Sequence, residues 1–233
     1  MSKSLILLFL FAVSIFSHAA TGKEFLKKVR ANYEDLNSLE LLMSYRLYKG
    51  HESNEVRESY GALFCRDGEQ SYRKIDQTEF INTKDYSIKI SHSEKMIVVS
   101  QASKMDAFDV DIETSLKWCE NVLVADKGEF NEISLIIKDR TDLPFSKINV
   151  VVDKKFWIRE MTLFYSTQMN FSSSYTNKEM DFPKIFIGYY DLKKKWNDKD
   201  GLLNMDNYIL VEEKKILPAT RLSGYTILNL TNS

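Results

Sequence analysis

The chain has 233 residues, with 32 Lys and Arg against 33 Asp and Glu, so it is close to neutral. This balance gives no reason to expect nucleic acid or an anionic membrane surface as a partner. The 14 Phe, 12 Tyr and 3 Trp favour a large sheet with a bulky interior, whereas two cysteines are too few for a disulfide scaffold.

The first 20 residues have the pattern of an export signal. Lys3 precedes an apolar run over residues 5–16, and the small residues that a signal peptidase requires follow at 17–20. We expect cleavage after Ala19 or Ala20, which leaves 31 basic and 33 acidic residues in a single soluble periplasmic domain over residues 21–233. An uncleaved anchor is less favoured, because the apolar run is shorter than the roughly 20 residues of a membrane span. We expect no membrane-spanning segment after Ala20.

An amphipathic helix is predicted directly after the signal. Thr21 suits the N-cap, and Phe25, Val29, Tyr33 and Leu36 recur at helical spacing, with charged residues on the other side. The pattern indicates a helix that lies on a sheet.

Alternating apolar and polar residues then predict a ladder of antiparallel strands from Glu40 to Gln101. Short connections such as the Asp67-Gly68 turn indicate sequential neighbours in a meander. The apolar face must be covered by helices, by another sheet or by a ligand. The residues expected on it are Leu41, Met43, Tyr45, Leu47, Tyr60, Phe64, Tyr86, Ile88 and Ile90.

The pattern changes between Ala107 and Val124, where Phe108, Ile112 and Leu116 recur at helical spacing and predict one or two further helices. Strands are expected again around residues 133–137, 148–152 and 156–165, the last two joined by a tight hairpin. The polar segment from Gln168 to Asp181 is expected to be a mobile loop, and strands follow near residues 184–190, 208–212 and 225–230. The fold class is therefore α+β and mainly antiparallel β, with about ten or eleven strands.

Groups that could carry chemistry are sparse. His51 and His92 fall in predicted turns and are interpreted as surface histidines, because neither adjoins a nucleophile motif. The acidic residues at 106–113 are interpreted as a solvated helix start, and no metal-ligand spacing or phosphate-binding loop is present. Cys65 and Cys119 are expected as buried thiols, with a disulfide as the alternative. We expect no catalytic residue, no cofactor and no metal.

The order of these elements carries a resemblance. A signal peptide precedes a helix that ends in Tyr33-Glu34-Asp35-Leu36-Asn37-Ser38-Leu39, and a meander follows with Gly61-Ala62-Leu63-Phe64 in its second strand. Over residues 23–165 this resembles the periplasmic outer-membrane lipoprotein carriers (LolA-like proteins) and their wider superfamily. The resemblance implies a curved, incomplete β-barrel whose concave face is covered by helices and receives acyl chains. Two turns depart from the family pattern: Arg66-Asp67-Gly68 replaces a Pro-Gly turn, and residues 82–85 lack an Asp-Gly-Lys signal.

The expected function is therefore periplasmic binding or carriage of lipid or lipoprotein acyl chains, without covalent chemistry. The apolar face defined above forms the expected cavity, and the residues expected to form its lid are Phe25, Val29, Tyr33, Phe108, Ile112 and Leu116. The resemblance implies inner- and outer-membrane lipoprotein transport proteins as partners, and we expect a monomer. The alternative is a periplasmic protein-interaction or sensor module that binds through an edge strand or the loop at residues 168–181. A hydrolase ranks third, because no catalytic group is placed.

Overall fold

The computed structural model describes residues 22–102, 116–139, 143–173, 177–212 and 215–231. The predicted signal peptide, the acidic residues at 106–113, Phe108 and Ile112 lie outside the described residues. The chain divides into two compact units. The first consists of Met1–Asp35, Tyr45–Ser59 and Val110–Gly188, and the second of Leu36–Ser44, Tyr60–Asp109 and Tyr189–Ser233. The single domain expected from the sequence stays a prediction.

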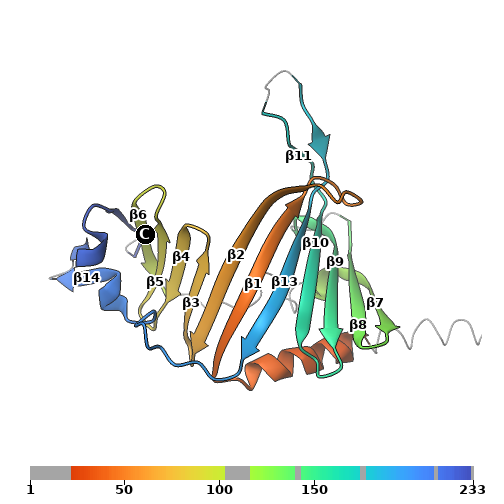
Figure 1. Ribbon diagram of the computed structural model, residues 1–233, viewed down its shortest axis with the longest axis horizontal. Coiled ribbons are helices and arrows are strands. Elements are labelled where there is room, and N and C mark those ends of the chain that lie inside the picture. Colours follow the sequence, from red (N-terminus) through yellow and green to blue (C-terminus); the bar gives the residue numbers. More distant parts are fainter. Residues whose placement is uncertain (1–21, 103–115, 140–142, 174–176, 213–214, 232–233) are drawn as a thin grey trace, which may run out of the picture. The chain divides into compact units, whose positions relative to one another are not determined.

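Twelve strands form one sheet, in the order β16-β6-β5-β4-β3-β2-β1-β13-β10-β9-β8-β7 (Figure 1). Their bounds are β1 Ser38–Tyr48, β2 Val56–Asp67, β3 Gln70–Ile75, β4 Thr78–Asn82, β5 Tyr86–Ser91, β6 Met96–Gln101, β7 Cys119–Lys127, β8 Phe130–Ile137, β9 Phe145–Asp153, β10 Ile158–Tyr165, β13 Lys184–Lys193 and β16 Thr226–Asn229. The sheet is open, because β16 and β7 end the order and are not neighbours. The mainly antiparallel β fold predicted from the sequence is confirmed. The last strand is an exception, since β16 runs parallel to β6.

The first unit contains the meander β7-β8-β9-β10 and a helix over residues 22–34. The Gly128 φ of 77° permits the turn between β7 and β8. The helix has the expected amphipathic pattern: Leu26, Val29 and Tyr33 are buried, whereas its charged residues are exposed. It ends before β1, as the sequence predicted.

The expected helix up to Val124 is wrong in its second part. Residues 116–118 are helical, but Cys119–Lys127 forms β7, in which Val122 pairs with Leu135 and Val124 with Ile133. Apolar residues at 119, 122 and 123 fit a helical repeat, yet alternation at 122 and 124 also fits a strand. The β-branched valines and the neighbouring strand β8 favour the strand.

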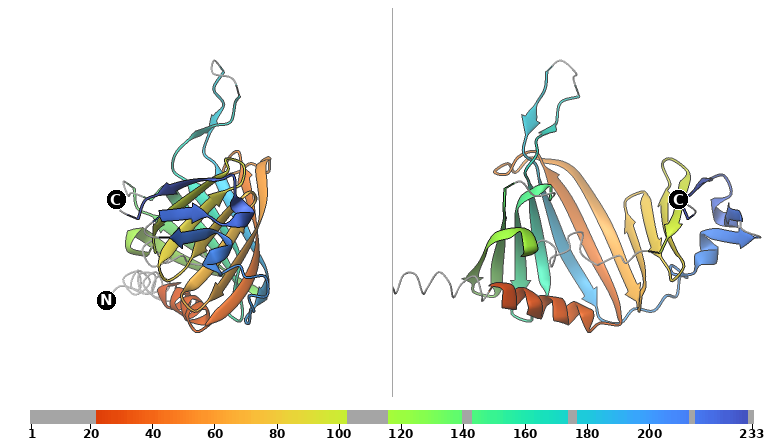
Figure 2. Two further views of the ribbon diagram at one scale, coloured as in Figure 1. Left: turned by 90° about the vertical axis from the view of Figure 1, so that its left-hand side faces the viewer. Right: turned by 180° about the vertical axis from the view of Figure 1, so that it is seen from behind.

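The segment expected as a loop between Gln168 and Asp181 contains a short antiparallel ladder of β11 (Met169–Asn170) and β12 (Met180–Asp181). The Asn170 carboxamide oxygen accepts the backbone N–H groups of Ser172 and Glu179 and so closes this ladder. Both views in Figure 2 show the described part of this segment, here called the arm (residues 166–173 and 177–183), standing away from the other strands of its unit.

The second unit contains the meander β2-β3-β4-β5-β6, and Gly68 occupies the first turn with a φ of 57°. Residues 196–212 and 215–225 pack on one face of β3–β6, and we call these two described stretches the cap. Within it lie the 3₁₀ turns η1 (Met205–Asn207) and η2 (Thr220–Leu222) and the ladder of β14 (Ile209–Glu212) and β15 (Lys215–Pro218). The strand expected near residues 208–212 is β14, which pairs with β15 in a ladder separate from the main sheet.

Candidate functional site

The residues expected to line one apolar face fall on two opposite faces of the second unit. Phe64 pairs with Arg73, Arg73 with Phe80 and Phe80 with Lys89, so these four residues lie on one face. In the adjacent register, Cys65, Tyr72, Ile81 and Ile88 form a row on the other face. Alternation along the strands places Tyr60 with Phe64, and Tyr86 and Ile90 with Ile88. The expected set therefore does not line a single cavity.

The face with Ile88 and Ile90, here called the capped face, is a closed core. Four residues of the cap are buried against it: Leu203, Tyr208, Ile209 and Leu222. The sheet side of the core comprises Cys65, Tyr72, Ile81, Ile88, Ile90, Ile97 and Val99. Because the cap belonged to a part of the sequence with weak periodicity, its packing here could not be predicted.

The four expected residues of β1 divide by burial. Leu41 and Met43 are buried in the second unit, whereas Tyr45 and Leu47 are half-buried in the first. The strand therefore alternates as predicted only in its first half.

The described lid residues hold the helix of residues 22–34 against the β9–β10 hairpin. The Phe25 ring packs on Phe156 with a centroid separation of 4.9 Å, and the Tyr33 ring packs edge-on against Trp157 at 5.0 Å. The backbone N–H of Ile158 donates to the Tyr33 hydroxyl at 3.2 Å, and burial raises the pKa of that hydroxyl. Val29 is buried, and Leu116 is half-buried in the helical turn before β7.

A continuous aliphatic face in the first unit was not included in the expected site. In register across four strands lie two rows, Ile133–Val150–Met161–Ile187 and Leu135–Ile148–Leu163–Ile185. Seven of these eight residues are buried, and Ile185 is half-buried. The other face of the same strands is mixed: Ser134 donates to Asn149 and Asn149 to Glu132, and apolar residues such as Val151 and Phe186 lie on the same face. The sequence contained the signal, since residues 133–137 and 148–152 alternate.

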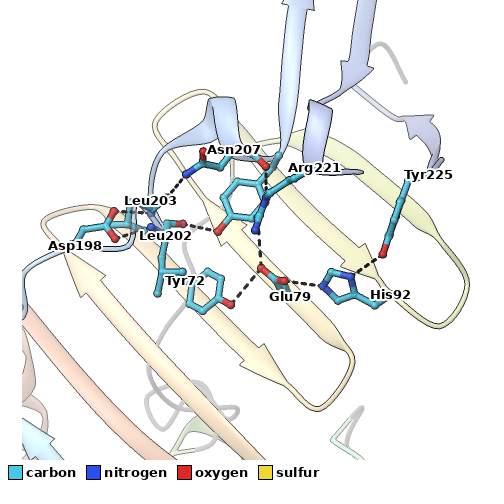
Figure 3. A network of polar contacts seen from close by, with 11 residues as sticks. Tyr72, Glu79, His92, Asp198, Leu202, Leu203, Asn207, Arg221 and Tyr225 are labelled. Atoms are coloured by element: carbon cyan, nitrogen blue, oxygen red, sulfur yellow. Dashed lines mark hydrogen bonds and ion pairs between the residues drawn. The ribbon is translucent and has the colours of Figure 1, made fainter. Parts of the chain in front are cut away.

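A polar network lies at the edge of the capped face (Figure 3). The Glu79 carboxylate is buried, accepts a hydrogen bond from the Tyr72 hydroxyl at 3.2 Å and lies 2.6 Å from His92 Nε2. The other ring nitrogen of His92, Nδ1, lies 2.8 Å from the Tyr225 hydroxyl. The Arg221 guanidinium lies 3.9 Å from Glu79. Burial and the nearby Glu79 carboxylate together raise the pKa of Tyr72.

The interpretation of both histidines as surface residues is wrong. His92 belongs to the network just described, and His51 is half-buried, with Nε2 3.0 Å from the Tyr165 carbonyl oxygen and its ring edge-on to Phe164. Turn positions gave no sign of these partners, because Tyr225 and Tyr165 come from distant parts of the sequence and Glu79 from another strand.

Cys65 and Cys119 are both free thiols, Cys65 buried and Cys119 half-buried. Among the described residues, no three His, Cys, Asp or Glu side chains gather as metal ligands. Within the same ranges, no helix is long and apolar enough to cross a bilayer.

No family model matches the chain, and no curated protein matches it. Among solved structures, an uncharacterized conserved protein from Thermus thermophilus is similar with 9% identity and a TM-score of 0.48, covering 90% of this chain and 99% of that one. A LolA superfamily protein from Nitrosomonas europaea has 13% identity and a TM-score of 0.34, covering 79% of this chain and 97% of that one. An outer membrane lipoprotein-sorting protein domain from Vibrio parahaemolyticus has 14% identity and a TM-score of 0.37, covering 79% and 97%. The LolA superfamily expected from the sequence is thus found among the similar structures.

Proposed function

We propose that the protein binds and carries an acyl chain of a lipid or lipoprotein, without covalent chemistry, on the aliphatic face of the first unit. The observation that supports this is the pair of aliphatic rows across β8, β9, β10 and β13, which contain no polar residue, whereas polar and charged residues interrupt the opposite face. Each methylene moved from water to such a surface gains about 0.8 kcal/mol. Ten methylenes give about 8 kcal/mol, a micromolar affinity before the costs of ordering the chain.

The helix of residues 22–34 is the proposed movable cover. These aliphatic side chains are buried, so a ligand reaches them only when a covering segment moves. The helix closes the end of the face at Trp157 and Ile158 through the Tyr33 contacts. In the periplasm, cargo release requires a competing site of higher affinity, which a membrane lipoprotein transport protein supplies.

Gly22 offers a direct test of this cover. A Cβ atom built on Gly22 lies 3.1 Å from the Cβ atom of Val122, somewhat closer than the roughly 3.8 Å typical of a disulfide. The variant Gly22→Cys with Val122→Cys, made with Cys65→Ser and Cys119→Ser, therefore locks the helix start to β7 under oxidising conditions.

The assay is native mass spectrometry of residues 21–233 with added palmitate. We expect the reduced double variant to bind palmitate and the oxidised form to lose binding by about tenfold or more, which is 1.4 kcal/mol. The single variant Gly22→Cys is the control, and its binding does not depend on reductant. If the reduced protein takes up no fatty acid, or if the disulfide leaves uptake unchanged, the proposal is refuted.

The arm supports the second candidate, a protein-interaction module. Met169, Met180 and Phe182 on it are 40%, 45% and 40% exposed, although each is large and apolar. Arg57 stacks on Phe171 and donates to its carbonyl oxygen, which ties the base of the arm to β2. Photocrosslinking from position 180 in periplasm distinguishes this candidate: a specific protein adduct together with a lipid-free native mass favours it over carriage.

A further inference from the structure

Several polar groups of the cap are satisfied within the cap itself. The Asp198 carboxylate accepts the backbone N–H groups of Leu202 and Leu203, and the Tyr208 hydroxyl donates to the Leu202 carbonyl oxygen at 2.8 Å. The Asn207 carboxamide donates to the Gly201 carbonyl oxygen, also at 2.8 Å. These bonds do not depend on the sheet. The cap can therefore leave the sheet with these hydrogen bonds intact, so the movement leaves none of these polar groups unsatisfied.

The sheet side is equally independent. Glu79 is held by Tyr72 of β3 and by His92 of the β5–β6 turn, and both partners remain when the cap is absent. A buried carboxylate that depended on the cap would make separation costly, because an unpaired buried charge is strongly unfavourable. Here the loss is confined to the contact with Arg221, because Tyr72 and His92 stay with the sheet.

Three features of the cap meet the capped face. Leu203, Ile209 and Leu222 supply apolar contact, the Arg221 guanidinium lies 3.9 Å from Glu79, and the Tyr225 hydroxyl lies 2.8 Å from His92. Arg221 has 46% of its side chain exposed and stacks on Tyr208 at 4.3 Å, so this cation rests at the rim of the core. In chemical terms, the cap presents an apolar body with a cationic and a hydroxyl-bearing end.

We propose that the capped face is a second ligand site, for a long-chain amphiphile with an amine-bearing head group, and that the cap is its displaceable cover. The ligand's chain replaces the leucines and isoleucine of the cap on Ile88 and Ile90, and its ammonium group replaces Arg221 at the Glu79 carboxylate. This site lies within the second unit and does not depend on the acyl site proposed for the first.

β16 follows the cap directly and is held in the sheet by contacts of its own. It forms a ladder with β6, and the Thr226 N–H donates to the Lys95 carbonyl oxygen. The proposed displacement of the cap therefore leaves β16 in place.

The test measures binding of dodecylamine, dodecanol and dodecanoate to residues 21–233 by calorimetry, below their micellar concentrations. We expect dodecylamine to bind best and dodecanoate worst, because Glu79 attracts the ammonium group and repels the carboxylate. The variant Glu79→Gln removes the charge, so we expect the preference for amine over carboxylate to disappear.

Two variants at the rim test the role of the cap. Arg221→Gln and Tyr225→Phe each remove one polar contact between cap and sheet, and we expect each to tighten dodecylamine binding by about threefold, and the double variant by about tenfold. Circular dichroism confirms that they fold. Hydroxyl-radical footprinting of the wild type gives an independent readout: the buried side chains of Leu203 and Leu222 gain labelling on binding, whereas those of Ile88 and Ile90 stay unlabelled.

Equal binding of amine and carboxylate, a preference that survives Glu79→Gln, or a cap that stays protected with ligand bound would each overturn the proposal. The disulfide between positions 22 and 122 separates this site from the acyl site. If the disulfide abolishes palmitate uptake and leaves dodecylamine binding unchanged, the capped site stands independently of the acyl site. If palmitate binds as proposed and dodecylamine does not bind, only the acyl site stands.

Discussion

Removal of the Tyr33 hydroxyl should destabilise the first unit by a predictable amount. Tyr33 is 4% exposed and Ile158 is 2% exposed, and the Ile158 N–H donates to the Tyr33 oxygen. In Tyr33→Phe the ring still packs on Trp157, but a buried N–H loses its acceptor, which costs about 1–3 kcal/mol. For a chain of this length that lowers the melting temperature by about 2–4 °C per kcal/mol. Tyr190→Phe, at an exposed tyrosine, is the matched control and should change stability by less than about 0.5 kcal/mol.

Alkaline pH provides the sharper version of this measurement. Burial raises the pKa of Tyr33 in the folded state, so above pH 10 the unfolded chain releases a proton that the folded chain keeps. The stability of the wild type therefore falls as pH rises, by about 1.4 kcal/mol per pH unit for this group, and the variant lacks this loss. Urea unfolding at pH 7, 10 and 11 should show the difference between the two proteins shrinking above pH 10. A constant difference would refute the assignment of a buried, neutral hydroxyl at this position.

Three further changes test particular features. Gly68→Ala should cost about 1 kcal/mol, because φ is 57° there, whereas Gly61→Ala, whose added Cβ meets nothing within 4 Å, should be neutral or slightly stabilising in the same melts. Maleimide at pH 8 should label Cys119 before Cys65, since burial raises the pKa of both thiols, that of Cys65 to about 12; peptide mass mapping checks the order. Asp198→Ala should raise the hydrogen-exchange rates of the Leu202 and Leu203 N–H groups by about tenfold, because the Asp198 carboxylate accepts hydrogen bonds from both. The exchange rates in β4 should stay unchanged.

The meanders were predictable because their signals are local. Alternation marks the strands at residues 86–91 and 133–137 and shows which of their residues share a face. The turn at Gly68 shows where the chain reverses direction. Each signal spans only a few residues. The amphipathic helix was predictable for the same reason. Its exact partners at Phe156 and Trp157 were not, because a buried stripe shows that a helix packs but not on which hairpin.

The expected cavity was wrong for a physical reason that applies to any ladder of strands. Alternation shows which residues of one strand share a face, but the relation between strands depends on their register. Phe64 and Ile88 both belong to apolar alternations, yet the pairings through β3 and β4 place them on opposite faces. β2 is buried on both faces at Phe64 and Cys65, and that double burial has no period-2 signature.

The two units distribute polar groups in ways that bear on their proposed roles. In the first unit, the aliphatic face is free of charged residues along both rows, which suits a chain that must slide in and out without directional bonds. In the second unit, a buried carboxylate borders the core and would reject any anionic head group, including that of a fatty acid. Free fatty acids and amines should therefore separate between the two faces on electrostatic grounds alone. A single substitution that removes the preference of the capped face for amines over fatty acids must therefore change Glu79. Among the described residues, Glu79 is the charged residue buried at that core.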